Sequence, residues 1–239
     1  MSRIQAECLC RVLYLRIGLE AGSAFTYEKN GVQFLFTAKH LFKPTFDKEC
    51  KVALLLDEGW EPFDANVFYC DNTNADIAVI RFQQQQNVTP HYEGQQFGTR
   101  NIVWGQDVFF LGFPLGFPFY NNVQVTSIPD RKIPVPFIKK ASLSAMGTGN
   151  DGSQILYLDG YNNPGFSGGP VCFRTIDQST MAIAGVVSGY LSDTKTVYDS
   201  TTGKPQATPN GHLCTHENTG IIIAYDIKHA IDIVDKILC

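Results

Sequence analysis

Short apolar runs separated by glycine, proline and small polar residues make up most of this chain. Runs of roughly four to eight residues, alternating or continuously apolar, are the pattern of β-strands. The segments that fit this pattern are 10–19, 32–37, 51–56, 66–69, 76–82, 107–111, 155–158, 171–173, 182–187 and 221–224. So many short strands separated by turns predict an all-β fold, built as a sandwich or a barrel.

Two segments depart from the strand pattern. Residues 83–106 begin with a run of glutamines and keep no apolar period. We interpret them as a crossing between a first subdomain, about residues 1–95, and a second one, about residues 102–225. Residues 226–238 place apolar side chains at offsets of three and four, which predicts an amphipathic helix packed on the second subdomain. Asp226 is the expected N-cap of this helix.

The composition is that of a folded chain without a charged binding surface. With 44% hydrophobic and 18% charged residues over 239 positions, the chain can bury a sizeable core. Its formal charge of -4 and the lack of a Lys/Arg cluster argue against a nucleic-acid partner. No apolar run approaches the ~18 residues of a membrane span, so we expect no membrane association.

The cysteines indicate a reducing environment. Their number, seven, is odd, and their positions follow no disulfide framework. The N-terminus carries Glu7 and no continuous apolar stretch, which is not the pattern of a secretory signal. We therefore expect reduced thiols and a cytoplasmic location. The CLC sequence at residues 8–10 lacks the spacing of a redox pair and is interpreted as part of a strand.

One group of residues has the composition of a metal site. His212, Cys214 and His216 alternate along the chain and would share one face of a strand. The fourth ligand and the usual zinc spacing are missing, so we expect structural or incidental residues and no bound metal.

The strongest chemical signal is a serine enclosed by glycines, in the run GFSGGP at residues 165–170. Glycine permits backbone conformations and close approaches that a side chain would forbid. The amides of Gly165 and Ser167 could then point into one small space and stabilise an oxyanion. The other interpretation is a tight turn that happens to contain a serine.

Two further segments argue against that simpler interpretation. His40 ends an apolar strand-like stretch, and Asp76 comes directly before another one. A single histidine at a strand end is more often structural, and Asp71 is a rival for the aspartate. The chain order histidine, aspartate, serine is nevertheless that of the chymotrypsin arrangement, and it differs from the subtilisin and α/β-hydrolase orders. An α/β-hydrolase would also need long helices between its strands.

These residues, together with several short motifs, resemble the trypsin-like serine proteases, in particular short bacterial-style members and in part the Deg-type protease domains. The motifs follow one another over residues 22–189, nearly the whole chain: GSAF at 22–25, TAKH at 37–40, DIAV at 76–79, GFP at 112–114, NPGFSGGP at 163–170 and GVVSG at 185–189. The resemblance implies two antiparallel six-stranded β-barrels with the active site between them, plus a C-terminal helix.

The resemblance also implies a role for each site residue. Ser167 would attack the peptide carbonyl, His40 would transfer the proton and Asp76 would orient His40. The amides of Gly165 and Ser167 would form the oxyanion hole, and an acyl-enzyme would then be hydrolysed. No metal or organic cofactor is implied, and the partner is a polypeptide substrate.

Substrate binding is implied at two places. Residues Tyr161, Asn162 and Asn163 would border the pocket for the side chain before the scissile bond. Ser188 and Gly189 would offer backbone groups to an extended peptide, although a plain strand end is the other interpretation. Members specific for Arg or Lys carry an acidic residue where Tyr161 stands. We therefore expect a neutral side chain to be preferred.

Two other features affect regulation. Digestive members have an aspartate before the nucleophile that pairs with a new N-terminus, but here Phe166 cannot form an ion pair. Activation by that route is not expected. Residues 191–219 are a long polar insertion, which we expect to form a hairpin or flap beside the cleft.

The leading hypothesis is therefore a serine endopeptidase. One alternative is a protease-fold module that binds an extended peptide without cutting it. The other is a latent protease dedicated to one partner. Nothing in the sequence specifies the oligomeric state.

Overall fold

The computed structural model describes residues 4–42, 49–57, 59–71, 74–91, 94–116, 119–120, 134–176, 180–209 and 211–239. Its helices, 3₁₀ turns and strands follow one another as α1 (Ala6–Cys10), β1 (Val12–Ile17), β2 (Glu20–Lys29), β3 (Val32–Thr37), η1 (Lys39–Leu41), β4 (Glu49–Leu56), β5 (Gly59–Tyr69), β6 (Ala78–Phe82), β7 (Gln96–Phe97), β8 (Asp107–Gly112), η2 (Pro114–Gly116), β9 (Phe119–Tyr120), β10 (Pro134–Val135), β11 (Phe137–Thr148), β12 (Gln154–Asp159), β13 (Pro170–Arg174), β14 (Met181–Thr196), β15 (Ala207–Thr208), β16 (Gly211–His212), β17 (Cys214–Asp226) and α2 (Lys228–Leu238). The all-β prediction is confirmed.

The first six strands close into an antiparallel barrel in the order β1-β2-β3-β6-β5-β4. Strand β3 of this barrel is buried on both of its faces. Leu35 points into the barrel with Leu54 and Ile80. Phe34 and Phe36, on the opposite face of the same strand, belong to a second buried cluster. A continuously apolar strand buried on both faces therefore forms the wall between the barrel and the rest of the molecule.

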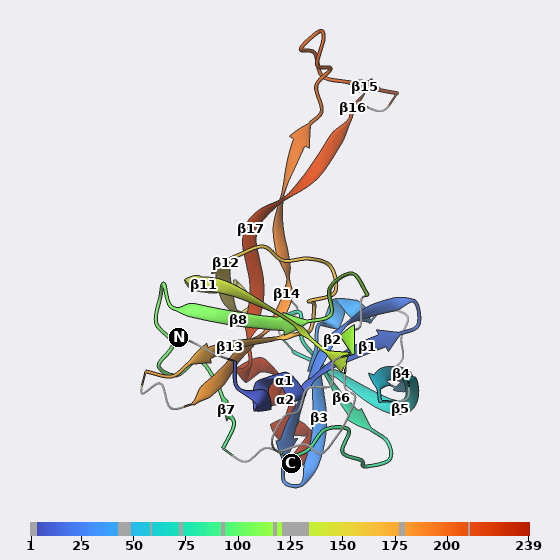
Figure 1. The fold of residues 1–239 in the computed structure, drawn as a ribbon, viewed down its shortest axis with the longest axis vertical. Coiled ribbons are helices and arrows are strands. Elements are labelled where there is room, and N and C mark those ends of the chain that lie inside the picture. Colours follow the sequence, from blue (N-terminus) through green and yellow to red (C-terminus); the bar gives the residue numbers. More distant parts are fainter. Residues whose placement is uncertain are drawn as a thin grey trace.

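The second half forms another ring of six antiparallel strands. Its order is β13-β8-β11-β12-β17-β14, and the ring closes because β13 pairs with both β8 and β14. The short β7 adds to β14 in a parallel direction. Phe110, Leu143 and Ile222 are among the fully buried residues inside the ring. The predicted two-barrel architecture is confirmed (Figure 1).

The C-terminal helix is confirmed but packs differently from the prediction. Ala230 and Val234 of α2 share a buried cluster with Phe36 and Val79 of the first barrel. Ion pairs from Lys29 to Asp235 and from Lys236 to Asp71 join the helix to that barrel as well. The helix therefore packs against both halves, because the cluster between the barrels needs an apolar cover.

The start of α2 also differs slightly from the prediction. The helix begins at Lys228, after Ile227. The Asp226 carboxylate still accepts the backbone N–H of Lys228 at 2.8 Å, and its other oxygen accepts the Thr99 hydroxyl at 2.9 Å. Asp226 thus satisfies a free amide of the first turn, as an N-terminal carboxylate is expected to do.

Several elements do not follow the apolar pattern and were not predicted, among them β2, β11 and α1. Strand β2 contains small residues and ends in charges, and β11 carries adjacent lysines, so neither presents an apolar run. Residues 8–10 were predicted to belong to a strand, and this was wrong, because they lie in the short helix α1. Cys8 and Cys10 are both buried, and burial at this spacing is compatible with a strand as well as with a helix. None of the seven cysteines, all of which lie in the described residues, forms a disulfide.

The polar insertion at 191–219 forms a hairpin. Strands β14 and β17 continue past the ring as two paired strands, from Ser192 opposite Asn218 to Thr196 opposite Cys214. Figure 1 shows them leaving the body of the molecule as a long projection in orange and red, with β15 and β16 near its end. We call residues 190–221 the arm. Most of its side chains are exposed.

Within the described residues, the helices are too short or too polar to cross a membrane.

Candidate active site

Ser167 lies in a loop made of two consecutive turns. In the first, the Phe166 N–H donates to the Asn163 carbonyl at 3.4 Å, with Gly165 at φ 104° in the third position. In the second, the Gly169 N–H donates to the Phe166 carbonyl at 2.9 Å, with Gly168 at φ 84°. Positive φ at the third turn position is the reason for glycine in type II turns.

Both glycines are also required for space. A Cβ on Gly165 would lie 2.3 Å from the Phe113 carbonyl oxygen, and one on Gly168 would lie 2.0 Å from the Ser23 carbonyl oxygen. These contacts are with backbone atoms, which cannot move aside as the end of a side chain can. Local geometry thus explains why glycines stand at positions 165 and 168.

Backbone hydrogen bonds fix the loop between the two barrels. The Ser167 carbonyl accepts the N–H of Ser23 in β2 at 2.8 Å. The Gly168 N–H donates to the Val187 carbonyl at 2.7 Å, and the Val187 N–H donates to the Gly169 carbonyl at 2.8 Å. The serine is therefore held at the junction of the first barrel and strand β14.

The predicted oxyanion amides have no partner within the described part of the chain. The Pro164 carbonyl accepts the Leu115 N–H at 2.9 Å, so the N–H of the same peptide, that of Gly165, points the other way. The Phe166 carbonyl is held in the same manner by Gly169, which directs the Ser167 N–H away from that bond. Two unpaired N–H groups beside a serine are what an oxyanion hole requires.

Ser23 supports this arrangement from the first barrel. Its buried hydroxyl donates to the Gly165 carbonyl at 2.7 Å and accepts the Phe113 N–H at 3.0 Å. Its own carbonyl accepts the Thr37 hydroxyl at 2.7 Å. In the sequence, Ser23 was noted only as part of the GSAF motif, and its contacts with the loop were not predicted.

His40 and Asp76 come together because their strands are neighbours. Strands β3 and β6 pair with Thr37 opposite Ala78, so the residues after β3 meet those before β6. The His40 Nδ1 lies 2.6 Å from Asp76 Oδ2, and the His40 backbone N–H donates to Asp76 Oδ1 at 2.8 Å. The carboxylate thus orients both the ring and the backbone of the histidine.

In this pair, each residue stabilises the charged form of the other. Burial raises the pKa of the Asp76 carboxyl, but the hydrogen bond and charge of His40, together with the Ser188 hydroxyl, bring it below its ordinary value. The hydrogen bond to Asp76 raises the pKa of His40 above 6.5, although burial works against it. An aspartate that stays ionised beside a histidine is suited to stabilise an imidazolium.

Ser188 links this pair to Ser167. Its hydroxyl donates to Asp76 Oδ2 at 2.5 Å, and its carbonyl accepts the Ser167 hydroxyl at 2.9 Å. Among the described residues, no hydrogen bond joins Ser167 to His40. His40 and Asp76 are therefore in direct contact, and Ser167 is connected to them only through Ser188. From the sequence, only the backbone groups of Ser188 were expected to take part, and the role of its side chain was not predicted.

The predicted pocket residues differ in exposure. Tyr161 is exposed and Asn162 is buried, and the Asn162 side-chain oxygen is buried without a partner in the described part of the chain. Lys139 of β11 lies beside them: its ammonium donates to the Tyr161 carbonyl and to the Asn163 side-chain oxygen, both at 2.6 Å. Burial lowers the pKa of this lysine. Lys139 was missed, because a lysine in a polar strand carries no sequence signal.

Phe166, the residue before Ser167, is held by packing and not by an ion pair. Phe166 is fully buried, and its ring contacts that of Phe110 at 4.9 Å between centroids. The Lys139 ammonium lies 5.7 Å from the centre of the Phe166 ring. An apolar anchor and a lysine therefore hold this loop in position, with no ion pair at Phe166.

Replacing Lys139 by methionine is expected to lower kcat/KM about tenfold, because its two hydrogen bonds to Tyr161 and Asn163 are lost. The loss should appear mainly in kcat and in the rate of fluorophosphonate labelling, with little change in melting temperature. Lys140→Met is the matched control, since the neighbouring lysine pairs with Asp107 at an exposed site. Equal effects of the two substitutions would show that Lys139 does not position the loop.

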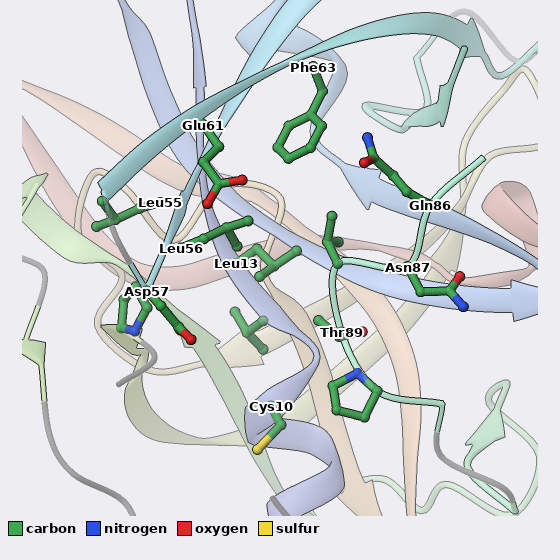
Figure 2. Close-up of a pocket in the computed structure, with 14 residues that line it drawn as sticks. Cys10, Leu13, Leu55, Leu56, Asp57, Glu61, Phe63, Gln86, Asn87 and Thr89 are labelled. Carbon is green, nitrogen blue, oxygen red and sulfur yellow. The ribbon is translucent and has the colours of Figure 1, made fainter. Parts of the chain in front are cut away.

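A pocket of about 340 Å³ lies on the first barrel, between β1, β4, β5 and residues 86–90. Figure 2 shows the apolar side chains of Leu13, Leu56 and Phe63 among the lining residues, together with the polar side chains of Glu61 and Asn87. None of the predicted site residues lines it.

The three-dimensional comparisons agree with the fold. The HtrA-type protease AlgW with a tripeptide matches with a TM-score of 0.60 at 17% identity, over 96% of this chain and 60% of that one. A serine endoprotease from Yersinia pestis matches with a TM-score of 0.57 at 14% identity, over 99% of this chain and 67% of that one. The MamO protease domain from Magnetospirillum magneticum, in its apo form, gives 0.52 at 16%, over 96% and 98%.

These neighbours are distant, and the chain spans about three fifths of the AlgW structure. No curated protein matches the sequence. The model of the trypsin-like peptidase domain matches residues 22–176, which include His40, Asp76 and Ser167 and most of both barrels. The chain therefore belongs to the trypsin-like peptidase family.

Proposed function

We propose that this protein is a serine endopeptidase in which Ser167, His40 and Asp76 form the catalytic triad. The observation that carries the proposal is the short contact between His40 and Asp76, at the junction where the glycine-rich loop presents Ser167. The two unpaired amides of Gly165 and Ser167 support it.

The mechanism needs the Ser167 side chain to change its hydrogen-bond partner. The Ser167 hydroxyl turns from the Ser188 carbonyl toward His40, gives its proton to the imidazole and bonds to the peptide carbonyl carbon. The Gly165 and Ser167 amides hold the oxyanion that forms. When the intermediate collapses, the C–N bond breaks, and the leaving amine takes the proton from His40. Water then repeats these steps on the acyl-enzyme and restores the Ser167 hydroxyl.

The test is hydrolysis of a randomised peptide mixture, with new termini located by mass spectrometry. Internal cleavages by the wild-type protein and none by Ser167→Ala are expected. The proposal is overturned if the wild-type protein cuts nothing or if the Ser167→Ala variant cuts equally well.

The same hydrogen bond from Ser167 to Ser188 favours a second candidate, a protease that is latent until its cleft is occupied. An incoming peptide N–H that took the Ser188 carbonyl would release the serine hydroxyl. Labelling by a fluorophosphonate would then accelerate when a non-cleavable peptide with a reduced scissile bond is added. A rate independent of this peptide would rule out latency of this kind.

The pH dependence is expected to follow His40. Because its pKa is raised above 6.5 and only the neutral ring accepts a proton, kcat/KM should rise with pH through a midpoint above 6.5. In Asp76→Asn the main cause of the raised pKa is removed, so the midpoint of the residual activity should shift to lower pH. Identical midpoints in the two proteins would contradict the coupling of His40 to Asp76.

A further inference from the structure

The proposed catalytic aspartate, Asp76, lies near the end of a loop of the first barrel. Residues 70–77 connect β5 to β6, and we call them the Asp76 loop. Ala75 and Ile77, the two neighbours of the aspartate, are fully buried, whereas Asn74 is exposed. The exposed Asn74 therefore leads directly into the buried backbone that carries the carboxylate.

A carboxylate of the second ring holds this loop at Asn74. Asp151 lies in the turn between β11 and β12, and its Oδ2 accepts the Asn74 backbone N–H at 2.8 Å. The two residues are 77 positions apart in the sequence and belong to different barrels. Only Ala75 separates the held amide from Asp76. Because peptide planes are rigid, the position of Asn74 limits where the Asp76 backbone can lie.

Asp151 is itself fixed by its own turn. Its Oδ1 accepts the Ser153 N–H at 3.1 Å and the Ser153 hydroxyl at 2.7 Å, and Ser153 is fully buried. The hydrogen bonds from Asn74 and from Ser153 lower the pKa of the Asp151 carboxyl to about 2. The carboxylate is therefore ionised at every pH at which His40 titrates, and it stays a strong acceptor for the Asn74 amide.

Tyr225 of β17 gives independent evidence that Asp151 lies near the catalytic pair. Burial is the main cause of the raised pKa of Tyr225, and the charges of Asp76 and Asp151 raise it further. One tyrosine thus lies within electrostatic reach of both carboxylates. Among the described groups, the charges that raise the pKa of His40 are those of Asp76 and Glu20, and Asp151 is not one of them. An influence of Asp151 on His40 must therefore act through the position of Asp76.

The second ring thus contacts the Asp76 loop at two points. The Ser188 hydroxyl of β14 donates to the carboxylate at 2.5 Å, and Asp151 accepts the backbone N–H two residues before it at 2.8 Å. His40, by contrast, reaches the same carboxylate from the first barrel. The half of the molecule that carries Ser167 therefore also holds the loop that carries the aspartate of the other half.

We propose that Asp151 is a positioning residue of the triad, which places Asp76 by holding the Asn74 amide. The proposal rests on the proposed peptidase function. The contact between His40 and Asp76, although both belong to the first barrel, then depends on the turn between β11 and β12 of the second ring. A substitution at Asp151 weakens the hydrogen bond between His40 and Asp76 without removing any group of the triad or of the oxyanion hole.

The first test is the pKa of His40, measured by NMR from the pH titration of its ring C–H signals in Ser167→Ala. Adding Asp151→Ala should lower this pKa toward 6.5, because the hydrogen bond to Asp76 is the largest cause of the raised value. Asp151→Asn, whose amide accepts weaker hydrogen bonds, should lower it by a smaller amount. An unchanged pKa in whichever of these variants folds overturns the inference. Because no peptide is cleaved here, a fall in the pKa supports the role of Asp151 even if the peptidase proposal fails.

The second test is cleavage of a good peptide with Ser167 intact. Asp151→Ala should lower kcat about tenfold with little change in KM, since the aspartate acts on proton transfer and not on substrate binding. In an Asp76→Asn background, the same substitution should change kcat by less than about twofold, because the residue through which Asp151 acts is already lost. Additive losses in the double variant would show that Asp151 does not act through Asp76, and would overturn the inference.

Asp199→Ala is the matched control. Asp199 is likewise a carboxylate that accepts backbone N–H groups, from Thr201 at 3.0 Å and from Thr202 at 2.7 Å, but it lies in the arm. This variant should keep both the pKa of His40 and kcat. If Asp199→Ala lowers them as much as Asp151→Ala does, the effect does not come from the contact with the Asp76 loop, and the inference is overturned.

Discussion

Asp76→Asn is expected to lower kcat about 10⁴-fold while leaving the fold intact. The carboxylate accepts hydrogen bonds from the His40 ring, from the His40 backbone and from Ser188. An amide of the same shape cannot accept all three, and it no longer stabilises the imidazolium or selects the tautomer that leaves Nε2 free for Ser167. The measurement is the single-turnover cleavage rate of a good peptide at saturating enzyme.

The matched control is Asp71→Asn. Asp71 was the rival aspartate in the sequence, but the structure pairs it with Lys236 on the surface. This variant should cleave at the wild-type rate. A loss in Asp71→Asn, or a loss below about tenfold in Asp76→Asn, would show that the aspartate was assigned wrongly. Thermal unfolding of both variants checks that the comparison concerns folded proteins.

Gly165→Ala is expected to lower kcat by about 10² to 10³. The new methyl group would lie 2.3 Å from the Phe113 carbonyl oxygen, at a residue whose φ of 104° an alanine rarely adopts. The turn must shift, and with it the Gly165 N–H that we propose as an oxyanion donor. The expected pattern is a loss in kcat with a smaller change in KM, because the oxyanion forms only after binding.

Gly203→Ala is the control for backbone strain alone. Gly203 also has positive φ, at 66°, but a Cβ there would meet no atom within 4 Å. It lies near the end of the arm, far along the chain from the glycine-rich loop. Gly203→Ala should lower stability by no more than about 1 kcal/mol and should keep kcat. If Gly165→Ala also keeps kcat, its amide does not take part in the reaction.

The sequence predicted those parts of the fold that depend on local patterns. Apolar runs such as 32–37 and 107–111 formed strands at nearly the predicted residues, because both faces of these strands are buried. Strands β2 and β11 were missed, because small residues and lysines interrupt their apolar pattern and tertiary pairing alone makes them strands. The helix α2 was found from its period, but its contacts with the first barrel depend on packing that the period does not contain.

The candidate site was likewise predictable only in part. His40, Asp76 and Ser167 were named from residue type, order and neighbouring motifs. The contacts that connect them, through the Ser188 hydroxyl and carbonyl, depend on a strand that reaches the site from the second barrel. Lys139 could not be found, because its contacts with Tyr161 and Asn163 join segments that are far apart in the sequence. The insertion was expected to be a hairpin or flap beside the cleft, and only the strand pairing shows that it continues β14 and β17 of the second ring.

The most direct test of the central claim, that Ser167 is an activated nucleophile, is labelling with a fluorophosphonate followed by mass spectrometry of the adduct. We expect one adduct, on Ser167, that is absent in Ser167→Ala and forms at least about 10³-fold more slowly in His40→Ala. An adduct elsewhere, or no adduct in protein that unfolds cooperatively and is therefore well folded, would contradict the assignment of Ser167 as the nucleophile.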